Sequence, residues 1–164
     1  MTLTARAALA ERSMERLLEK RGDITRPVLD IYYARHPGTR ESFVEHGMGD
    51  TAELEGRMVT AAAFMLLQWA EDPFSTRIAQ GTTISHHHDT LLVGPQWYLG
   101  LFDAVLDVLL ATIPADAPEE RTMWLEIRTE IAAYIDSVRP EFWRRDEDGP
   151  LPPYRESFAK IVLE

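Results

Sequence analysis

Three consecutive histidines, His86 to His88, carry the side chains of this sequence with the clearest potential for chemistry. On a helix, His88 shares a face with three apolar residues, one four positions before it and two that follow at three and four: Ile84, Leu91 and Leu92. An imidazole on an apolar stripe needs a partner for its ring nitrogen, and a bound metal is one such partner. The pattern therefore predicts that His88 is a metal ligand on the wall of an apolar pocket.

The two neighbouring histidines should point elsewhere. Successive helical residues are about 100° apart, so three in a row cannot share a face. His86 falls on a polar face with threonines and Asp89, and His87 lies between the two faces. Two alternatives remain for His88. It could be a buried histidine bonded to a backbone carbonyl, or part of a solvent-exposed histidine cluster that binds metal ions adventitiously.

The composition limits the class of protein. A chain of 164 residues with 45% hydrophobic residues is long enough for one domain with a substantial core. Its 17 basic and 27 acidic residues give a net charge of −10. This charge disfavours nucleic acid and anionic membranes as partners, because both attract basic surfaces. The lack of cysteine excludes disulfides, thiolate zinc sites and thiol nucleophiles.

Neither a secretory signal nor a membrane span is expected. The N-terminal segment is amphipathic and charged rather than continuously apolar. No apolar run approaches the roughly 20 residues that a membrane helix needs. Together with the absence of cysteine, these features predict a cytoplasmic protein with no membrane partner.

Apolar residues recur at helical spacing along the whole chain, with no alternation at period two. We therefore predict an all-α fold of about six to eight helices. A short turn is expected over residues 38–43 and a loop over residues 44–49. The expected helices are Thr4–Lys20, one from Asp23 to His36–Pro37, Thr51–Glu71, Ser75–Leu92, one opened by Gly94–Pro95, and one begun by Asp116 with Glu119 and stopped by Pro140.

The pattern divides the chain into a domain over residues 1–140 and a C-terminal extension over residues 141–164. The extension is charged and then proline-rich, with a short helix expected over Tyr154–Val162. Its aromatic content is higher than a disordered tail usually has, through Phe142, Trp143, Tyr154 and Phe158. We expect it to dock as a strap, either in cis or across a homodimer.

Four segments, in order, give residues 5–139 a resemblance to a bacterial single-domain globin. Residues 36–43 (His-Pro-Gly-Thr-Arg-Glu-Ser-Phe) resemble the globin segment His-Pro-x-x-Arg-x-x-Phe. His88 is followed at five, seven and ten residues by Val93, Pro95 and Tyr98, which is similar to the proximal segment. Two further likenesses are Leu54 with Arg57-Met58, at the start of the distal helix, and Trp124 with Ile131, in the last helix.

The resemblance implies a globin-like fold that holds heme b, with His88 as the proximal iron ligand. Arg57 would meet a heme propionate, as could His46. The apolar contacts could instead be residues packed in the core without touching heme. Arg57 could instead be an ordinary charge on the surface. The implied heme contacts are Phe43, Leu29, Leu54, Met58, Arg57, Ile84, Val93, Tyr98, Leu101 and Phe102.

The implied function is reversible binding of oxygen, carbon monoxide or nitric oxide at a five-coordinate iron, for storage, scavenging or gas sensing. Leu54 and Leu29 would make the distal pocket apolar, unless the helix register turns Glu55 inward. The chain is too short after Arg139 for a flavin domain, so nitric oxide dioxygenase or peroxidase turnover would need a separate reductase. The alternative is a heme-free globin-fold sensor or interaction module that acts through a partner protein.

Overall fold

The computed structural model describes residues 1–156, and these residues form seven α-helices and no strand. This confirms the predicted all-α class and is consistent with a globin-like fold. None of the seven helices is long and apolar enough to cross a membrane. The helices are α1 (Leu3–Arg21), α2 (Thr25–Arg35), α3 (Thr39–His46), α4 (Thr51–Glu71), α5 (Pro73–Asp89), α6 (Pro95–Leu110) and α7 (Pro118–Val138), followed by a 3₁₀ turn, Arg139–Glu141.

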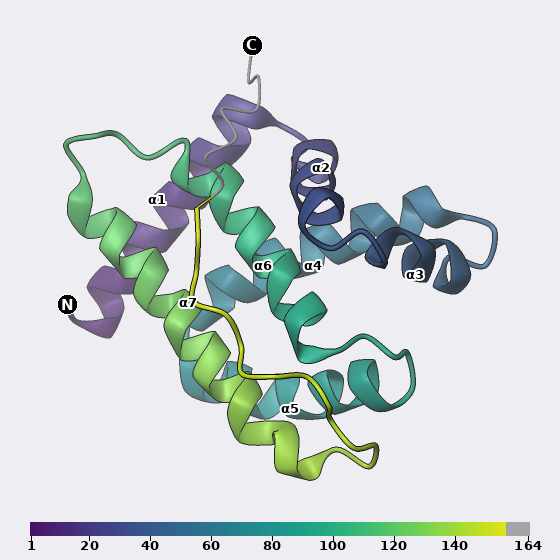
Figure 1. Cartoon of the computed structure of the whole chain (residues 1–164). Helices are drawn as coiled ribbons and strands as arrows, with labels where there is room; N and C mark the ends of the chain where they lie inside the picture. Colours follow the sequence, from purple (N-terminus) through teal and green to yellow (C-terminus); the bar gives the residue numbers. More distant parts are fainter. Residues whose placement is uncertain (157–164) are drawn as a thin grey trace.

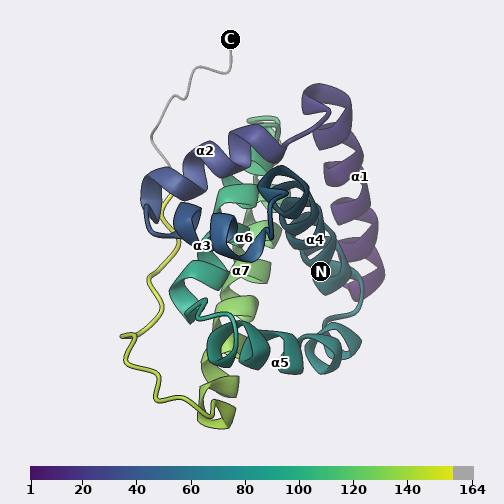
Figure 2. The ribbon, with the colours of Figure 1, turned by 90° about the vertical axis from the view of Figure 1, so that its right-hand side faces the viewer.

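Helix α6 lies at the centre of the molecule, and most of its residues are buried (Figure 1). Helices α1, α2, α4 and α7 surround it and contribute the largest buried side chains, Trp69 of α4 and Trp124 of α7 among them. Helix α5 crosses the end of this core and buries only Thr76 and Ile84 (Figure 2). The histidine-bearing helix is therefore peripheral, with one face turned toward the core.

Local capping explains where several helices begin. The carboxylate of Asp50 accepts the backbone N–H of Glu53 at 3.0 Å and so caps the start of α4. Asp72 caps α5 in the same way, accepting from Ser75 at 3.0 Å, so this helix begins two residues before the expected start. The predicted box of Asp116 with Glu119 is wrong, because α7 begins at Pro118 without a side-chain cap.

Helix α3 occupies residues for which a turn and a loop were expected. Its hydrogen bonds continue through His46 to the N–H of Gly47, which bonds to the carbonyl of Phe43 at 2.9 Å. The chain then reverses through Met48 and Gly49, both with positive φ. As a result, His46 lies on a helix rather than in a loop.

Helix α5 ends at Asp89, three residues before the predicted end. The backbone N–H groups of Thr90 and Leu91 both bond to the carbonyl of His86, at 3.0 and 3.3 Å. Leu92 has a φ of 57°, in the left-handed region, and turns the chain away from the helix axis. Leu91 and Leu92 therefore do not extend the helical face on which His88 lies.

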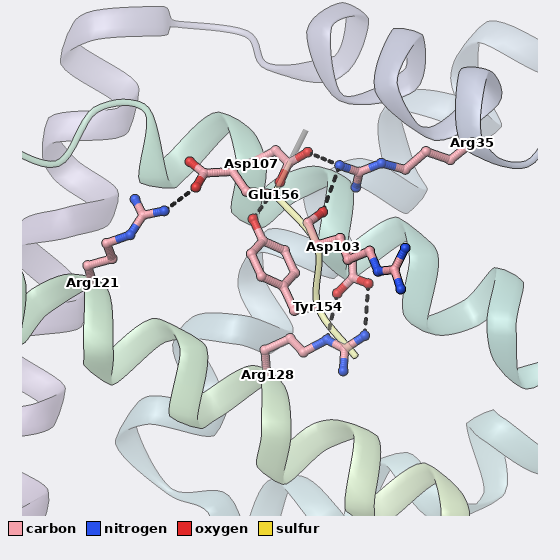
Figure 3. Close-up of polar contacts among 8 residues, drawn as sticks. Arg35, Asp103, Asp107, Arg121, Arg128, Tyr154 and Glu156 are labelled. Atoms are coloured by element: carbon pink, nitrogen blue, oxygen red, sulfur yellow. Dashed lines mark hydrogen bonds and ion pairs between the residues drawn. The ribbon is translucent and has the colours of Figure 1, made fainter. Parts of the chain in front are cut away.

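Residues 142–156 form a C-terminal strap that runs back along α7 and α6 (Figures 1 and 2). Its far end enters a cluster of charged side chains (Figure 3). The hydroxyl of Tyr154 donates to Asp107 of α6, which also bonds to Arg35 of α2. The strap thus docks in cis. Residues 154–156 are not helical, and Phe158 and the rest of the expected Tyr154–Val162 helix lie outside the described residues.

A second arginine fastens the middle of the strap. Arg128 of α7 forms two hydrogen bonds with the carboxylate of Asp103 in α6, at 2.8 and 3.0 Å (Figure 3). It also donates to the carbonyl of Pro152 at 2.8 Å. Arg128 therefore joins α6, α7 and the strap through one guanidinium group.

The near end of the strap is held by the last turn of α5. The carboxylate of Asp89 accepts the backbone N–H groups of Trp143 at 2.9 Å and of Arg144 at 3.2 Å. The imidazole of His88 bonds to Asp89 at 2.7 Å and stacks on Phe142 with ring centroids 4.1 Å apart. The indole of Trp143 is 94% exposed, so Phe142 is the aromatic residue that docks here.

Replacing Asp89 with asparagine is expected to release the near end of the strap. The pKa of Asp89 lies below its usual range, chiefly because the carboxylate accepts the N–H of Trp143. His88 and Arg144 lower this pKa further, and partial desolvation opposes them. Because the folded pKa is lowered, this contact is fully formed above the ordinary carboxyl pKa and weakens as the pH falls through the folded value.

Amide hydrogen exchange of Trp143 and Arg144 measures this release. At neutral pH, Asp89→Asn should lower both protection factors severalfold, and the parent should lose the same protection only on acidification. Asp50→Asn is the control, because Asp50 caps α4 and does not bond to the strap. Equal protection in the parent and Asp89→Asn at neutral pH would show that the carboxylate does not hold the strap.

Candidate functional site

An apolar cavity lies among α3, α4, α5 and α6. Its volume is about 300 Å³. The mouth is marked by Ala61 and Phe64 of α4, which line the cavity and are also exposed to solvent. A volume of this size is at the lower end of the range of ligand-binding pockets.

Seven of the predicted contact residues line this one cavity. They come from three helices and from the α5–α6 connection, and the topology brings them together although they are far apart in the sequence. Glu55 is turned away, since it accepts the hydroxyl of Tyr33 at 2.5 Å, so the register of α4 places Leu54 inward. The seven are Phe43, Leu54, Met58, Val93, Tyr98, Leu101 and Phe102.

Three other predicted residues do not line the cavity. Leu29 and Ile84 are buried in the helical core. They match the alternative of plain core packing that the sequence analysis left open for the apolar contacts. Arg57 lies on the exposed face of α4, where its guanidinium is 3.7 Å from Glu53. Arg57 is thus a surface charge in this structure, because the face of α4 that carries Leu54 and Met58 points the other way.

Of the three consecutive histidines, the one on the cavity wall is His87, and the prediction that His88 faces this apolar cavity is wrong. The prediction assumed that the helix continues through Leu92, which would give His88 two apolar neighbours one turn later. Since α5 ends at Asp89, those neighbours are absent, and His88 packs against the strap through Asp89 and Phe142. His86 is exposed, as predicted.

His87 lines the cavity with its ring in a defined protonation state. Its Nδ1 lies 2.8 Å from the carbonyl oxygen of Thr83, one turn earlier, and must donate because a carbonyl only accepts. Burial lowers the pKa of His87, outweighing the opposite effect of the Thr83 carbonyl. The neutral ring therefore carries a lone pair on Nε2, which bonds to no group within residues 1–156.

Tyr98 supports the ring of His87 from α6. The two ring centroids are 5.2 Å apart and the rings meet edge to face. Burial raises the pKa of the Tyr98 phenol, which keeps it protonated, and its hydroxyl lies 3.5 Å from the side-chain oxygen of Gln80. Tyr98 thus fixes the orientation of the imidazole and carries no charge.

The remaining wall includes residues that the sequence analysis did not assign to a site. Met65 and Gln68 continue the spacing of Leu54, Met58 and Ala61 along α4, so helical periodicity could have identified them. Trp97 carried no such signal, because it lies in the first turn of α6. His46, for which the resemblance allowed a contact with a propionate, lines the cavity from the end of the unexpected helix α3. No lysine, arginine, aspartate or glutamate of residues 1–156 lines the cavity.

The cavity offers no cluster of ligands for a bare metal ion. Within the part of the chain that the structure describes, no group of three or more His, Cys, Asp or Glu side chains is placed to hold one. Comparisons with protein-family models, with curated proteins and with solved structures found no match to this chain. The geometry of the cavity is therefore the basis for the functional argument.

Proposed function

We propose that this chain is a heme-binding protein of the globin type that reversibly binds a diatomic gas. The observation that supports the proposal is the imidazole of His87, which lines an apolar cavity and whose Nε2 bonds to no group of the described chain. Apolar walls with one convergent nitrogen fit a planar apolar macrocycle whose metal needs an axial ligand. His87 thus takes the role that the sequence resemblance implied for His88.

The residues of the chain would hold the group in two ways. The Thr83 carbonyl orients the imidazole and fixes its tautomer, as a hydrogen-bond partner of a metal-binding histidine typically does. Phe43, Leu54 and Met58 exclude water from the cavity. Bound heme would supply an iron with an open position at which oxygen, carbon monoxide or nitric oxide adds.

The surroundings of His87 favour binding over redox turnover. Its Nδ1 bonds to a neutral carbonyl, and no carboxylate of residues 1–156 lines the cavity to make the imidazole more electron-donating. Arg139 pairs with Asp136 and Asp146 at the start of the strap. We therefore propose a carrier or sensor of a gas, for which any enzymatic turnover would need a separate reductase.

The lining residues bear on the charge of the group that they would hold. No lysine or arginine of the described chain lines the walls, so the cavity residues would pack against the apolar part of a heme and would offer its anionic propionates no counter-ion.

Hemin titration of the purified apoprotein tests the proposal. The parent is expected to take up one hemin and develop a sharp Soret band. Ala61→Trp should abolish this band, because an indole at the mouth would fill the cavity from an exposed helical position without displacing the core. Ala79→Trp is the matched control on α5, since Ala79 is exposed and does not line the cavity.

The outcomes separate the two functions that the sequence left open. A Soret band in the parent and Ala79→Trp, but not in Ala61→Trp, would support heme binding in this cavity. A parent that is helical by circular dichroism and takes up no hemin would reject the proposal. The heme-free sensor or interaction module would then be the better interpretation, with the same cavity open to a smaller apolar ligand.

A further inference from the structure

The near end of the strap carries a patch of side chains that have no partner in their own chain. The patch is residues 143–148, Trp-Arg-Arg-Asp-Glu-Asp, and the strap runs along the outside of the molecule there (Figures 1 and 2). The indole of Trp143 is 94% exposed. Four further side chains of the patch form no ion pair or hydrogen bond within residues 1–156, namely Arg144, Arg145, Glu147 and Asp148.

The backbone of the patch is nevertheless held in place. At its start, the Asp89 carboxylate accepts the N–H groups of Trp143 and Arg144, at 2.9 and 3.2 Å. Farther along, Asp146 pairs with Arg139 and also accepts a backbone N–H two residues later, at 3.0 Å. The unpartnered side chains therefore project from a fixed backbone, which lowers the entropy lost when a partner binds them.

A groove of about 520 Å³ lies between the patch and the α5–α6 connection. One wall is residues 144–148, and the other includes the apolar side chains of Leu92 and Trp97. Leu92 is 60% exposed, so this wall offers apolar surface that the chain itself does not cover. Trp143 does not line the groove of its own chain. Its indole is an apolar group of the kind that such a groove can bury.

The charges of the patch are complementary to those of a second copy of the same patch. Two unpaired arginines are followed, one residue later, by two unpaired acids. A two-fold axis brings the same surface of two molecules together, and two copies of a segment that cross it run antiparallel. Arginines of each copy would then lie opposite acids of the other. The net charge of −10 disfavours other contacts between copies, which lack this local match.

We propose that residues 143–148 form the centre of a two-fold interface between two copies of this chain. Trp143 of each copy enters the groove of the other, and Arg144 and Arg145 of each pair with Glu147 and Asp148 of the other. Tryptophan and arginine are the residue types that most often dominate the binding energy of protein interfaces. The proposal does not depend on heme binding, and its failure would leave the proposed function unaffected.

The mass of the purified chain in solution, measured by light scattering over a range of concentrations, tests the proposal. The parent should have twice the chain mass. Trp143→Ala should raise the dissociation constant of the dimer at least about 30-fold, as removal of an interface hot spot does. Phe74→Ala is the matched control, because Phe74 is 73% exposed and lies at the opposite end of α5 from Asp89.

Charge reversal gives a more specific test, because it predicts a rescue. Arg144→Glu with Arg145→Glu makes every charge of the patch negative, and this variant should be monomeric. Glu147→Lys with Asp148→Lys leaves a mostly positive patch and should also be monomeric. An equal mixture of the two variants should form a heterodimer, since each supplies the charges that the other lacks.

Arg12→Glu with Arg26→Glu is the control for net charge, because both residues are exposed on α1 and α2. It should remain dimeric. Circular dichroism verifies that each variant is folded. A parent that is monomeric at every concentration would overturn the proposal and leave the groove to a different partner. A dimer that persists in Trp143→Ala and in both charge reversals would also overturn it, because the contact would then lie on another face.

Discussion

The His87→Ala variant is expected to bind hemin at least about 100-fold more weakly than the parent, whereas His88→Ala should bind it as the parent does. Removal of His87 takes away the anchored nitrogen at the cavity wall. Loss of a group that hydrogen-bonds to a metal ligand weakens metal binding about 10- to 100-fold, so loss of the ligand itself should exceed that range. Spectrophotometric titration, together with the rate of hemin transfer to an excess of a scavenger, measures the difference.

His88→Ala is the informative control because it changes the adjacent histidine of the same helix. It removes the stacking on Phe142 and the bond to Asp89, and both contacts belong to the strap. Equal hemin affinity in His87→Ala and the parent, with weakened binding in His88→Ala, would reject the cavity assignment. It would also restore the sequence interpretation of His88.

Replacement of Arg128 by leucine is expected to lower the free energy of unfolding by about 3–5 kcal/mol. The side chain of Arg128 is 5% exposed and that of its partner Asp103 is 13% exposed. Leucine would leave the Asp103 carboxylate with little solvent and no counterion, and would free the carbonyl of Pro152 (Figure 3). Urea unfolding, followed by circular dichroism, gives the change directly.

Two controls separate a buried charge from the loss of an ordinary ion pair. The double variant Arg128→Leu with Asp103→Leu should recover most of the lost stability, since a buried pair replaced by apolar residues is often neutral. Arg26→Ala breaks a pair whose side chains are 83% and 46% exposed, and should change stability by less than about 1 kcal/mol. A single Arg128→Leu variant as stable as Arg26→Ala would contradict the argument.

The sequence predicted the helices well where apolar spacing is long and caps are strong. Helix α4 was found from Thr51 to Glu71, because Asp50 caps its start and Pro73 follows its end. Helix α3 was missed, because eight residues with one buried side chain carry too little periodicity. The early end of α5 was missed because Leu92 adopts a left-handed conformation that a leucine rarely takes.

The same two errors account for what was missed at the site. A helix end misplaced by three residues gave His88 apolar neighbours that it does not have, and so hid the position of His87 on the cavity wall. The missing helix α3 left His46 in a loop with no defined direction. The predicted pocket residues Leu54, Met58 and Phe102 do line one cavity, because their directions depend on helix faces that long helices define.

The three consecutive histidines also bear on how free metal ions act on this chain. In the folded state His86 meets solvent, His87 the cavity and His88 the strap, so the tract cannot chelate one ion. In the unfolded chain no helix keeps the three imidazoles apart. Free nickel or zinc ions should therefore bind the unfolded chain in preference to the folded one, and by mass action should shift the equilibrium toward unfolding.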